Sequence, residues 1–435
     1  MKLCMIGTGY VGLVSGTCFA DIGNIVYCVD KDISKINKLN QGVSPIYEPG
    51  LDELIKKNHL AKRLIFTTDL KKAVTLSDII FICVGTPNIK NSSKVDLSHV
   101  YKATKEIISI TKNKKIIVTK STVPIGTGDE IEKIISKRRV KNIDIISNPE
   151  FLREGEAIRD FKYPDRIVIG SNNKKVFKLM KTLYRPLINK GAKFFETSRR
   201  GSELIKYASN AFLATKITFI NELANLCEKT GININDISMG MGSDNRIGSR
   251  FLRAGPAYGG SCFPKDTKGL VSAAEKYKIN LSIVRSVIKS NHNRLSLLTK
   301  RIHKIIGNKI KNKKIAFLGV TFKPNTDDMR DSTSLHMIPY LCKKGAYVSY
   351  YDPSGKKKDF VKLTNCNYAN NILDNCKNAD LIILHTEWDE FKILDFKKIN
   401  KKKNMKIYDL RNLYNLNEMK NQKIKYYSIG RPNLS

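Results

Sequence analysis

The chain has 435 residues, of which 41% are hydrophobic and 27% are charged. This length predicts about two to four domains and excludes a small single module, and the composition excludes a disordered chain. Lysine and arginine number 77 against 40 aspartates and glutamates, so the formal net charge is +37. Such a charge would suit nucleic acid or an anionic membrane surface as a partner.

The distribution of the basic residues argues against both partners. Most of the excess is lysine, scattered singly or in short runs such as Lys401-Lys402-Lys403, and no arginine-rich or aromatic-interleaved stretch could read or stack bases. No stretch approaches the apolar length of a membrane-spanning helix. We therefore expect no nucleic acid and no membrane among the partners.

The cysteines and the first residues indicate the compartment. Nine cysteines without a C-x-x-C pair fit neither a disulfide framework nor a structural zinc site, which favours a reducing compartment. Met1–Ile6 is typical of a buried strand that runs into glycines, and it leaves no room for a signal or transit peptide. We expect a cytoplasmic protein.

The opening third alternates short β-branched runs with amphipathic stretches, which is typical of a parallel sheet covered by helices. A long helix is expected from Gly201 to about Thr230, because this segment lacks proline and Gly231 can end it. The strand pattern restarts near Lys313. The expected strands are Leu3–Ile6, Ile25–Val29, Leu64–Thr67, Ile79–Val84, Ile116–Thr119, Ile143–Ser147, Lys314–Leu318, Tyr347–Tyr351, Leu381–His385 and Lys406–Asp409.

A glycine loop follows the first expected strand and precedes a helix-compatible run: Gly7-Thr8-Gly9-Tyr10-Val11-Gly12. Glycines in this spacing allow a tight turn, close approach of the backbone to a pyrophosphate and packing of helix on strand. Asp30 ends the next strand, where it can bind both ribose hydroxyls and repel a 2′-phosphate, so NAD is favoured over NADP. Lys31 and Lys35 soften this preference, and a glycine turn without a ligand is the alternative.

These observations predict an α/β protein with two Rossmann-like, doubly wound parallel-sheet domains, joined by a long central helix and a helical middle domain. The predicted domains are 1–200, 201–300 and 301–435. Two segments, Ser77–Ile82 and Ala379–Leu384, look alike across the halves, although generic sheet periodicity also produces such an echo.

The densest unusual segment is Gly255–Asp266, called the cysteine loop below. Its glycines and prolines predict a loop, in which Cys262 would be exposed to ligands. Lys265 and a nearby helix N-terminus would favour the thiolate that attacks carbonyls. An incidental core cysteine is the alternative, as for Cys4 and Cys28 on their expected strands.

Other candidate site residues lie on the long helix and at strand ends. Lys206 and Asn210 share one face of the helix, either as a functional pair or as a snorkelling surface pair. Asn148–Gly155 and Ser121–Pro124 each follow a strand end, the usual place for ligand contacts in such sheets. The carboxylates within Asn148–Gly155 could equally be solvated loop charges.

Taken together, these motifs resemble the UDP-glucose/GDP-mannose dehydrogenase family, and within it the UDP-glucose 6-dehydrogenases, which oxidise an alcohol to a carboxylate in two steps. The resemblance runs nearly end to end. It is carried by Gly7–Gly12, Val84–Pro87, Ser121–Pro124, Asn148–Gly155, Glu203–Asn210, Tyr258–Asp266 and Leu318–Lys323.

The resemblance implies that the chain oxidises UDP-glucose to UDP-glucuronate with two NAD, as a homodimer or higher homo-oligomer, with NAD on the first domain and UDP on the last. The implied cofactor contacts are Gly7, Gly9, Tyr10, Val11, Gly12, Asp30, Lys35, Thr86, Thr122, Glu154, Lys265 and Arg330. The implied substrate contacts are Glu150, Phe151, Leu152, Arg153, Lys206, Asn210, Phe251, Leu252, Arg253, Tyr258, Gly259, Lys323 and Arg411, with Arg246 from a neighbouring subunit.

The implied mechanism uses Asp266 as a base through a water also held by Thr122, while Lys206 and Asn210 stabilise the developing oxyanion. Cys262 would then form a thiohemiacetal that is oxidised to a thioester. Glu150 would be the base for hydrolysis of the thioester. No histidine lies in the motifs, so we expect no histidine base and no metal.

The second glycine loop and the substrate remain open to other interpretations. Leu318–Pro324 has one glycine where a dinucleotide loop needs three, so it suits the phosphates of a nucleotide sugar better than NAD. A dehydrogenase of another nucleotide sugar, such as UDP-N-acetylmannosamine or GDP-mannose, is the nearest alternative. A catalytically silent protein that binds NAD or nucleic acid is the alternative from a different class.

Overall fold

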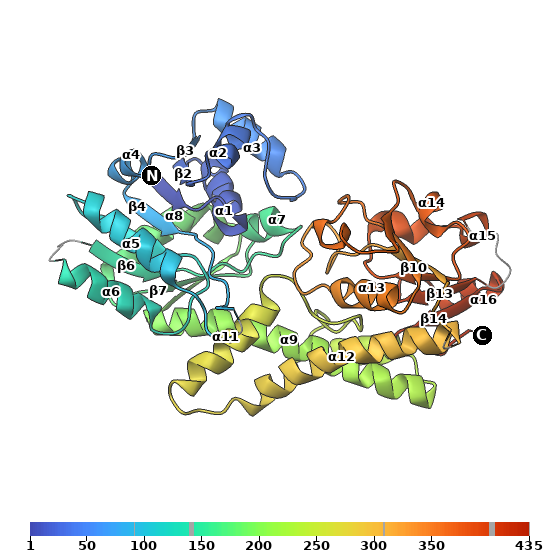
Figure 1. The fold of residues 1–435 in the computed structure, drawn as a ribbon. Helices are drawn as coiled ribbons and strands as arrows, with labels where there is room; N and C mark the ends of the chain where they lie inside the picture. Colours follow the sequence, from blue (N-terminus) through green and yellow to red (C-terminus); the bar gives the residue numbers. More distant parts are fainter. Residues whose placement is uncertain (91, 139–142, 308, 400–404, 435) are drawn as a thin grey trace. The chain divides into compact units, whose positions relative to one another are not determined.

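The computed structural model describes residues 1–90, 92–138, 143–307, 309–399 and 405–434, so the run Lys401-Lys402-Lys403 lies outside the described residues. The chain forms two compact units (Figure 1). The first unit comprises Met1–Ser209 and Lys268–Ile279, and the second comprises Asn210–Thr267 and Asn280–Ser435. The predicted three-domain division stays a prediction.

The first unit is built on an eight-stranded sheet in the order β3-β2-β1-β4-β5-β6-β7-β8. Its strands are parallel except that β6 and β7 pair antiparallel. The strands are β1 (Lys2–Ile6), β2 (Ile25–Val29), β3 (Leu64–Thr67), β4 (Ile79–Ile82), β5 (Lys115–Thr119), β6 (Ile143–Ser147), β7 (Arg166–Gly170) and β8 (Lys193–Thr197).

Alternate residues of the central strands enter two separate cores, as period-two geometry requires. Leu3 and Met5 of β1 pack with helices on one face, whereas Cys4 and Ile6 pack with helices on the other. The first face carries α1 (Tyr10–Asp21), α2 (Ile33–Asn40), α3 (Leu51–Leu60), α7 (Ala157–Lys162) and α8 (Lys175–Ile188). The second carries α4 (Leu70–Leu76), α5 (Ser98–Ile110) and α6 (Thr127–Lys137).

The second unit is built on a six-stranded, wholly parallel sheet in the order β11-β10-β9-β12-β13-β14. Its strands are β9 (Lys314–Leu318), β10 (Tyr347–Tyr351), β11 (Cys366–Tyr368), β12 (Leu381–Leu384), β13 (Lys406–Asp409) and β14 (Lys425–Ser428). Its order repeats that of the first six strands of the other sheet. The doubly wound α/β class predicted from the sequence is confirmed.

Helices again cover both faces of this sheet. One core contains α12 (Ser282–Ile306), α13 (Ser334–Lys343) and the second part of α9 (Arg199–Thr230), and the other contains the short elements near the C-terminus. These short elements are α14 (Ile372–Cys376), η2 (Asp389–Ile393), α15 (Phe396–Ile399) and α16 (Leu416–Asn421). The unit also contains α10 (Ile234–Gly242) and η1 (Lys358–Phe360).

The ten expected strands form close to their predicted bounds, but the sequence prediction missed β7, β8, β11 and β14. Three of these lie at sheet edges, where burial is partial and the alternation is weak: β11 has three residues and β8 has no buried residue. The run Ile167-Val168-Ile169 of β7 was a usable signal. The two segments that look alike in the sequence form β4 and β12, which occupy the same position in the two sheets.

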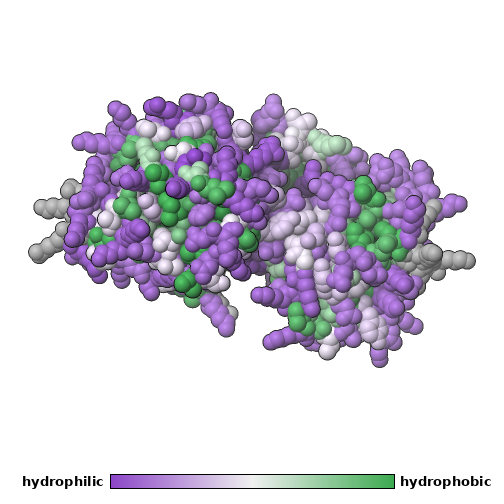
Figure 2. Space-filling model, turned by 90° about the horizontal axis from the view of Figure 1, so that it is seen from above, coloured by the Kyte–Doolittle hydropathy of each residue, from purple (hydrophilic) through white to green (hydrophobic). Residues whose placement is uncertain are grey.

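The predicted long helix is confirmed as α9, with 32 residues. The first unit ends and the second begins within it, at Ser209 and Asn210. Among the described residues, no helix combines the length and the apolar character that crossing a membrane requires. Hydrophilic residues cover most of the face shown in Figure 2, with apolar residues gathered in small patches.

Candidate active site

The glycine loop Gly7–Gly12 connects β1 directly to α1, and each glycine has a different reason to be there. Gly7 has φ +100°, and a Cβ on it would lie 2.8 Å from Cys83 O. A Cβ on Gly12 would lie 1.9 Å from Gly7 O, so the helix can approach the strand only with glycine at this position. A Cβ on Gly9 would meet nothing within 4 Å, which leaves open space above the loop for a phosphate.

Asp30 follows β2 and lies against this loop. Its Oδ2 accepts hydrogen bonds from Thr8 N at 2.9 Å and Thr8 Oγ1 at 2.7 Å, and its Oδ1 accepts from Asp32 N at 3.1 Å. Partial burial would raise the pKa of Asp30, but these hydrogen bonds and Lys35, 3.9 Å away, lower it overall. The carboxylate is therefore ionised, and at 16% exposure it remains accessible to a ligand.

The loop after β6 is tied to α1 by a residue that the sequence prediction missed, Glu48. The Glu48 carboxylate accepts hydrogen bonds from Gly155 N at 2.6 Å and Ala157 N at 2.7 Å, and Tyr10 Oη also donates to it. Glu48 is 8% exposed although it lies in a Glu-Pro-Gly turn. It fixes the loop that carries Glu154, and no local pattern in the sequence marks this role.

A buried ion pair lies at the other end of this loop. Lys206 Nζ of α9 lies 3.1 Å from Glu150 Oε1, and the two side chains are 3% and 5% exposed. Glu150 Oε2 also accepts from Leu152 N at 2.5 Å. The Phe151 ring lies under two cations, with Arg166 Cζ at 3.9 Å and Lys206 Nζ at 5.2 Å from its centroid. The structure thus brings together two predicted catalytic residues of the first unit.

The remaining predicted residues of the first unit lie at adjacent strand ends or in the same loop. Thr86 Oγ1 donates to Thr122 O at 2.9 Å, which joins the loops after β4 and β5. Arg153 is held by Asp160, with Nη2 2.6 Å from Oδ1, and by Glu156 at 2.7 Å, so its guanidinium already has carboxylate partners. Glu154 is half-buried beside it.

In the second unit, Cys262 directly precedes α11 (Phe263–Glu275). The prediction of a loop through Asp266 was therefore wrong for its last four residues: proline is tolerated in the first turn of a helix, so Pro264 does not prevent α11 from starting. Asp266 N donates to Cys262 O at 2.8 Å, which is the first hydrogen bond of the helix. The half-buried thiol thus stands at the positive end of a helix dipole, which favours a thiolate.

Asp266 binds two of the other predicted residues. It is fully buried, and its Oδ2 accepts from Asn210 Nδ2 of α9 at 2.6 Å. Its Oδ1 accepts from Lys265 Nζ, also at 2.6 Å. Lys265 therefore directs its charge at Asp266. Ser261 Oγ lies 3.4 Å from Cys262 Sγ.

The cysteine loop packs tightly against the loop after β9. A Cβ on Gly259 would lie 2.4 Å from Asp331 O, and a Cβ on Gly260 would lie 2.7 Å from the Phe322 ring. Gly260 N also donates to Arg330 O at 2.8 Å. These two glycines therefore let the loop that carries the predicted Lys323 and Arg330 lie directly on the cysteine loop.

Other predicted substrate residues surround this pair of loops in the second unit. Arg411 Nη2 donates to Phe322 O at 2.6 Å, and a Cβ on Gly255 would lie 3.5 Å from its Nη1. Lys323 Nζ lies 5.7 Å from the centroid of the Phe322 ring. Tyr258 is buried, and its ring packs on Phe263 at 6.2 Å between centroids.

The rest of the predicted set lies nearby in the chain or on the surface. Phe251 has φ +65° and packs on Phe263, Leu252 is buried, and Arg253 is exposed. Arg246 is 89% exposed and is paired with Asp244 at 2.6 Å. Within the described ranges, no group of three histidine, cysteine, aspartate or glutamate side chains is placed to hold a metal ion.

Three features together define the class of two-sheet nucleotide-dependent dehydrogenases. They are a glycine loop between the first strand and its helix, an accessible acid at the end of the second strand, and a second doubly wound sheet. The chain belongs to the UDP-glucose/GDP-mannose dehydrogenase family. It matches the NAD binding domain of that family over residues 1–188, the central domain over 200–293 and the UDP binding domain over 316–416. The protein is an NAD-dependent dehydrogenase.

Relatives agree with this assignment. The chain is 49% identical over 438 residues to a UDP-glucose 6-dehydrogenase of Rhizobium meliloti, covering 99% of this chain and 100% of the relative. It is similar to the structure of a UDP-glucose dehydrogenase from Pyrobaculum islandicum, with a TM-score of 0.90, 32% identity and coverage of 98% and 97%. It is also similar to a UDP-D-ManNAc dehydrogenase from Pyrococcus horikoshii, with a TM-score of 0.87, 25% identity and 99% coverage of both chains.

Proposed function

We propose that the enzyme oxidises UDP-glucose to UDP-glucuronate with two NAD per sugar, through a covalent intermediate on Cys262. The observation that carries this proposal is the thiol at the N-terminus of α11, next to a buried cluster of Asp266, Asn210 and Lys265. A thiolate in that place is a nucleophile for an aldehyde, and the adjacent carboxylate is a proton acceptor. The relatives named UDP-glucose 6-dehydrogenase support the choice of sugar.

The first oxidation converts the C6 alcohol to an aldehyde. C6 loses a hydride, and its hydroxyl loses a proton to Asp266 through a water that Thr122 also holds. Asn210 Nδ2 carries two N–H donors, and one of them is bonded to Asp266, so the other can bind the substrate oxygen. Lys206 donates to the same oxygen as negative charge develops on it. When bound, NAD would supply the hydride acceptor, with a separate NAD molecule for each of the two oxidations.

The second oxidation needs a fourth substituent on the aldehyde carbon. Cys262 Sγ adds to C6, and the oxygen takes up a proton to give a thiohemiacetal. C6 then loses its second hydride and the hydroxyl loses its proton, which leaves a thioester. Water, deprotonated by Glu150, adds to the thioester, the C–S bond breaks, and the thiol and a carboxylate form. Lys206 stabilises the tetrahedral oxyanion of this hydrolysis.

The glycine loop and Asp30 are the proposed contacts of NAD. The space above Gly9 suits the pyrophosphate at the N-terminus of α1, where backbone N–H groups are available. Three N–H or O–H groups donate to Asp30, and a carboxylate can accept about four hydrogen bonds, so capacity remains for a ribose hydroxyl. Tyr10, Val11, Lys35, Thr86, Thr122, Glu154, Lys265 and Arg330 complete the proposed NAD contacts.

The second unit is proposed to hold the UDP moiety. Lys323 and Arg411 place positive charge beside the cysteine loop, which suits a diphosphate. Glu150, Phe151, Leu152, Arg153, Phe251, Leu252, Arg253, Tyr258 and Gly259 complete the proposed substrate contacts.

We also propose that the enzyme is a homodimer or higher homo-oligomer, in which Arg246 reaches the site of a neighbouring subunit. Phe212, Phe219 and Leu226 of α9 are 66%, 48% and 59% exposed and recur every seven residues, so they form one apolar stripe along the helix. A stripe of this kind favours a second copy as its cover. Sedimentation that shows an active monomer at assay concentration would contradict the proposal.

A substrate panel tests the proposed function. UDP-glucose, UDP-galactose, two UDP-N-acetylhexosamines and GDP-mannose are each incubated with NAD and with NADP, and NADH or NADPH is followed by absorbance. We expect NADH from UDP-glucose above all others. If the enzyme prefers a UDP-N-acetylhexosamine, that sugar nucleotide replaces UDP-glucose as the proposed substrate. The similarity to a UDP-D-ManNAc dehydrogenase supports this second candidate.

A further inference from the structure

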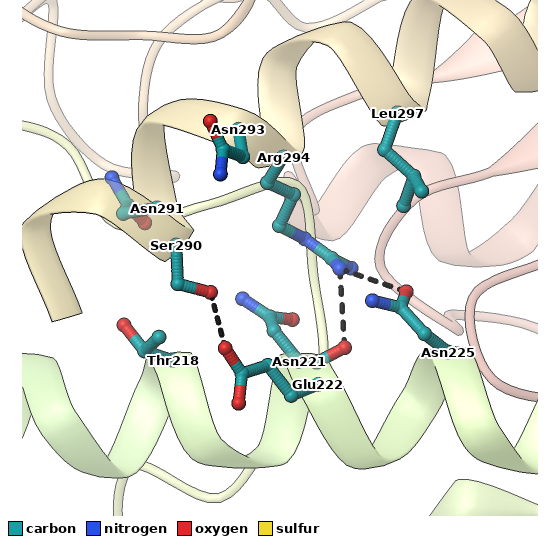
Figure 3. A pocket seen from close by; sticks show the side chains of 9 residues that line it. All are labelled: Thr218, Asn221, Glu222, Asn225, Ser290, Asn291, Asn293, Arg294 and Leu297. Carbon is teal, nitrogen blue, oxygen red and sulfur yellow. Dashed lines mark hydrogen bonds between the residues drawn. The ribbon is translucent and has the colours of Figure 1, made fainter. Parts of the chain in front are cut away.

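A polar pocket of about 140 Å³ lies between α9 and α12 in the second unit (Figure 3). Its wall contains Arg294, which projects from α12 towards Asn221 and Asn225 of α9. Arg294 is only 5% exposed, and burial lowers the pKa of its guanidinium to about 10. A charge buried to this degree is costly unless strong hydrogen bonds satisfy it.

The hydrogen bonds of Arg294 lead to the cysteine loop. Its Nε and Nη2 donate to Gly255 O at 2.9 and 2.6 Å, and its Nη1 donates to Asn221 O at 3.2 Å and Asn225 Oδ1 at 3.3 Å. Its partners are thus carbonyl oxygens of a helix and of the loop. Hydrogen bonds from a charged donor are roughly twice as strong as neutral ones. The buried charge therefore serves to hold the backbone at Gly255.

Two asparagines complete this attachment. Asn221 Oδ1 accepts from Gly255 N at 2.9 Å. Asn291 of α12 accepts from Tyr258 N at 3.0 Å and donates to Tyr258 O at 3.1 Å, so it pairs with both backbone groups of one residue. The N–H and C=O groups of Gly255 and of Tyr258 are therefore all bound by side chains of α9 and α12.

This attachment is made to the backbone of the loop and not to its side chains. Residues 255–260 form no helix or strand, so side chains must supply what regular structure would otherwise provide. Three residues separate Tyr258 from Cys262, and Gly260 N is bound by Arg330 O. The attachment at Tyr258 thus restrains the short segment that leads to the thiol.

We propose that Arg294, Asn291 and Asn221 are positioning residues that hold Cys262 in place for the covalent step. This inference rests on the proposed role of Cys262. A thiol must meet the aldehyde carbon at a defined distance and angle, and a misplacement of about 1 Å can cost on the order of 100-fold in rate. Alcohol oxidation needs no bond to sulfur, so the second oxidation is the more sensitive of the two.

Asn291→Asp is the sharpest test, because it keeps the shape and the acceptor for Tyr258 N but loses the donor to Tyr258 O. Asn291 is half-buried, so the substitution is milder than one at Arg294. Asn293→Ala is the matched control: it lines the same pocket from the same helix and is exposed. Arg294→Lys, which keeps the charge but not the fork of donors, is the second test variant.

Two measurements report on the position of the thiol. We expect kcat for UDP-glucose to fall about tenfold or more in Asn291→Asp and Arg294→Lys, with a smaller change in KM and release of free aldehyde. The rate of Cys262 alkylation by iodoacetamide against pH should shift its midpoint upward by about half a pH unit as the thiol leaves the α11 N-terminus. A role in stability alone would not move this midpoint, and the same shift in Arg294→Lys, which keeps the charge, excludes the carboxylate added in Asn291→Asp as its cause.

NAD affinity, measured by calorimetry, and the thermal midpoint show whether each variant is folded. The inference is overturned if a folded Asn291→Asp enzyme matches Asn293→Ala in kcat, aldehyde release and alkylation midpoint. If Arg294→Lys fails to fold, Asn291→Asp alone decides. If Cys262→Ala keeps two NADH per sugar, the proposed function fails independently of these variants.

Discussion

The two sheets have the same strand order over six strands but differ in the loop that leaves the first strand. In the first unit, residues 7–9 alone separate β1 from α1, whereas in the second unit residues 319–333 separate β9 from α13. Both loops start with a glycine at positive φ. A Cβ on Gly7 would meet Cys83, the first residue after β4, and a Cβ on Gly319 would meet Thr386, the second residue after β12. The same turn therefore starts both loops, and the length of the loop after this turn decides what each can bind.

An acid ends the second strand in both units. Asp30 follows β2 and Asp352 follows β10, and each accepts from the first loop, Asp30 from Thr8 N and Asp352 from Val320 N at 2.8 Å. Asp352 is fully buried and also accepts from Ser354 Oγ at 2.5 Å, whereas the side chain of Asp30 is 16% exposed. Asp30 is thus accessible to a ribose, whereas Asp352 is buried and its carboxylate binds groups of its own unit.

Strand order and a strand-end acid are common to the two sheets, whereas the first sheet combines them with a short loop and an accessible acid, the two features that we propose bind NAD. The long second loop instead lies on the cysteine loop, with Asp331 O and the Phe322 ring against Gly259 and Gly260. We propose that this second loop contributes to binding of the substrate.

The largest effect should come from the loop glycines. In Gly9→Ala the added methyl fits the free protein, but it occupies the space proposed for the pyrophosphate, so we expect an unchanged thermal midpoint and an NAD KM raised by about 100-fold. In Gly319→Ala the methyl would lie 2.5 Å from Thr386 Cβ at φ +73°, so the thermal midpoint should fall with little change in NAD KM. Equal NAD KM values for Gly9→Ala and the unaltered enzyme would contradict the proposed place of the pyrophosphate at Gly9.

Substitution of the two strand-end acids should likewise separate NAD binding from stability, with a smaller change in the NAD KM. Asp30→Ala removes a charged acceptor of the ribose, so the NAD KM should rise roughly tenfold with little change in affinity for UDP-glucose. Asp352→Ala leaves buried N–H groups without their acceptor and should lower stability by about 3 kcal/mol with an unchanged NAD KM. Equal use of NADP and NAD by the unaltered enzyme would contradict the role of Asp30.

A third prediction concerns buried groups of opposite charge at corresponding strand ends. Lys120 follows β5, and burial lowers its pKa to about 8; Asp409 ends β13, and burial raises its pKa. Folding disfavours the charged Lys120, so stability is lost as pH falls from about 10.5 through about 8, by roughly 3 kcal/mol. For Asp409 the sign is opposite: stability is lost as pH rises from its ordinary pKa through the raised value.

Lys120→Met tests this sign. Relative to the unaltered enzyme, its thermal midpoint should be a few degrees higher at pH 7 and the difference should vanish near pH 10.5. Lys133→Met, at an exposed position of α6, is the control. A Lys120→Met difference that does not depend on pH would show that packing, and not charge, is responsible.

Strands with strong apolar runs and motifs with glycine could be predicted from the sequence, since burial and backbone conformation leave local signals. The edge strands β8, β11 and β14 left weak signals, because a strand exposed on one or both sides need not be apolar.

Within the candidate site, residues in dense motifs could be predicted from the sequence. Residues that fix those motifs by hydrogen bonds from distant helices could not. Cys262 and Asp266 stand in a conspicuous run, whereas Asn291 and Arg294 lie in an ordinary amphipathic helix. Their role depends on backbone groups that are 33 and 39 positions away in the chain. Contacts across such separations leave no pattern in a single sequence. Glu48 was missed for the same reason, because its partner Gly155 is 107 positions away.

The covalent role of Cys262 is best tested by counting the NADH formed per UDP-glucose, with assay of free aldehyde, in the unaltered enzyme and in Cys262→Ala. We expect two NADH and no free aldehyde for the unaltered enzyme, since the intermediate stays bound to sulfur between the oxidations. Cys262→Ala should form at most one NADH and leave an aldehyde or its hydrate. Two NADH per sugar at near-normal turnover in Cys262→Ala would show that Cys262 is not the covalent residue.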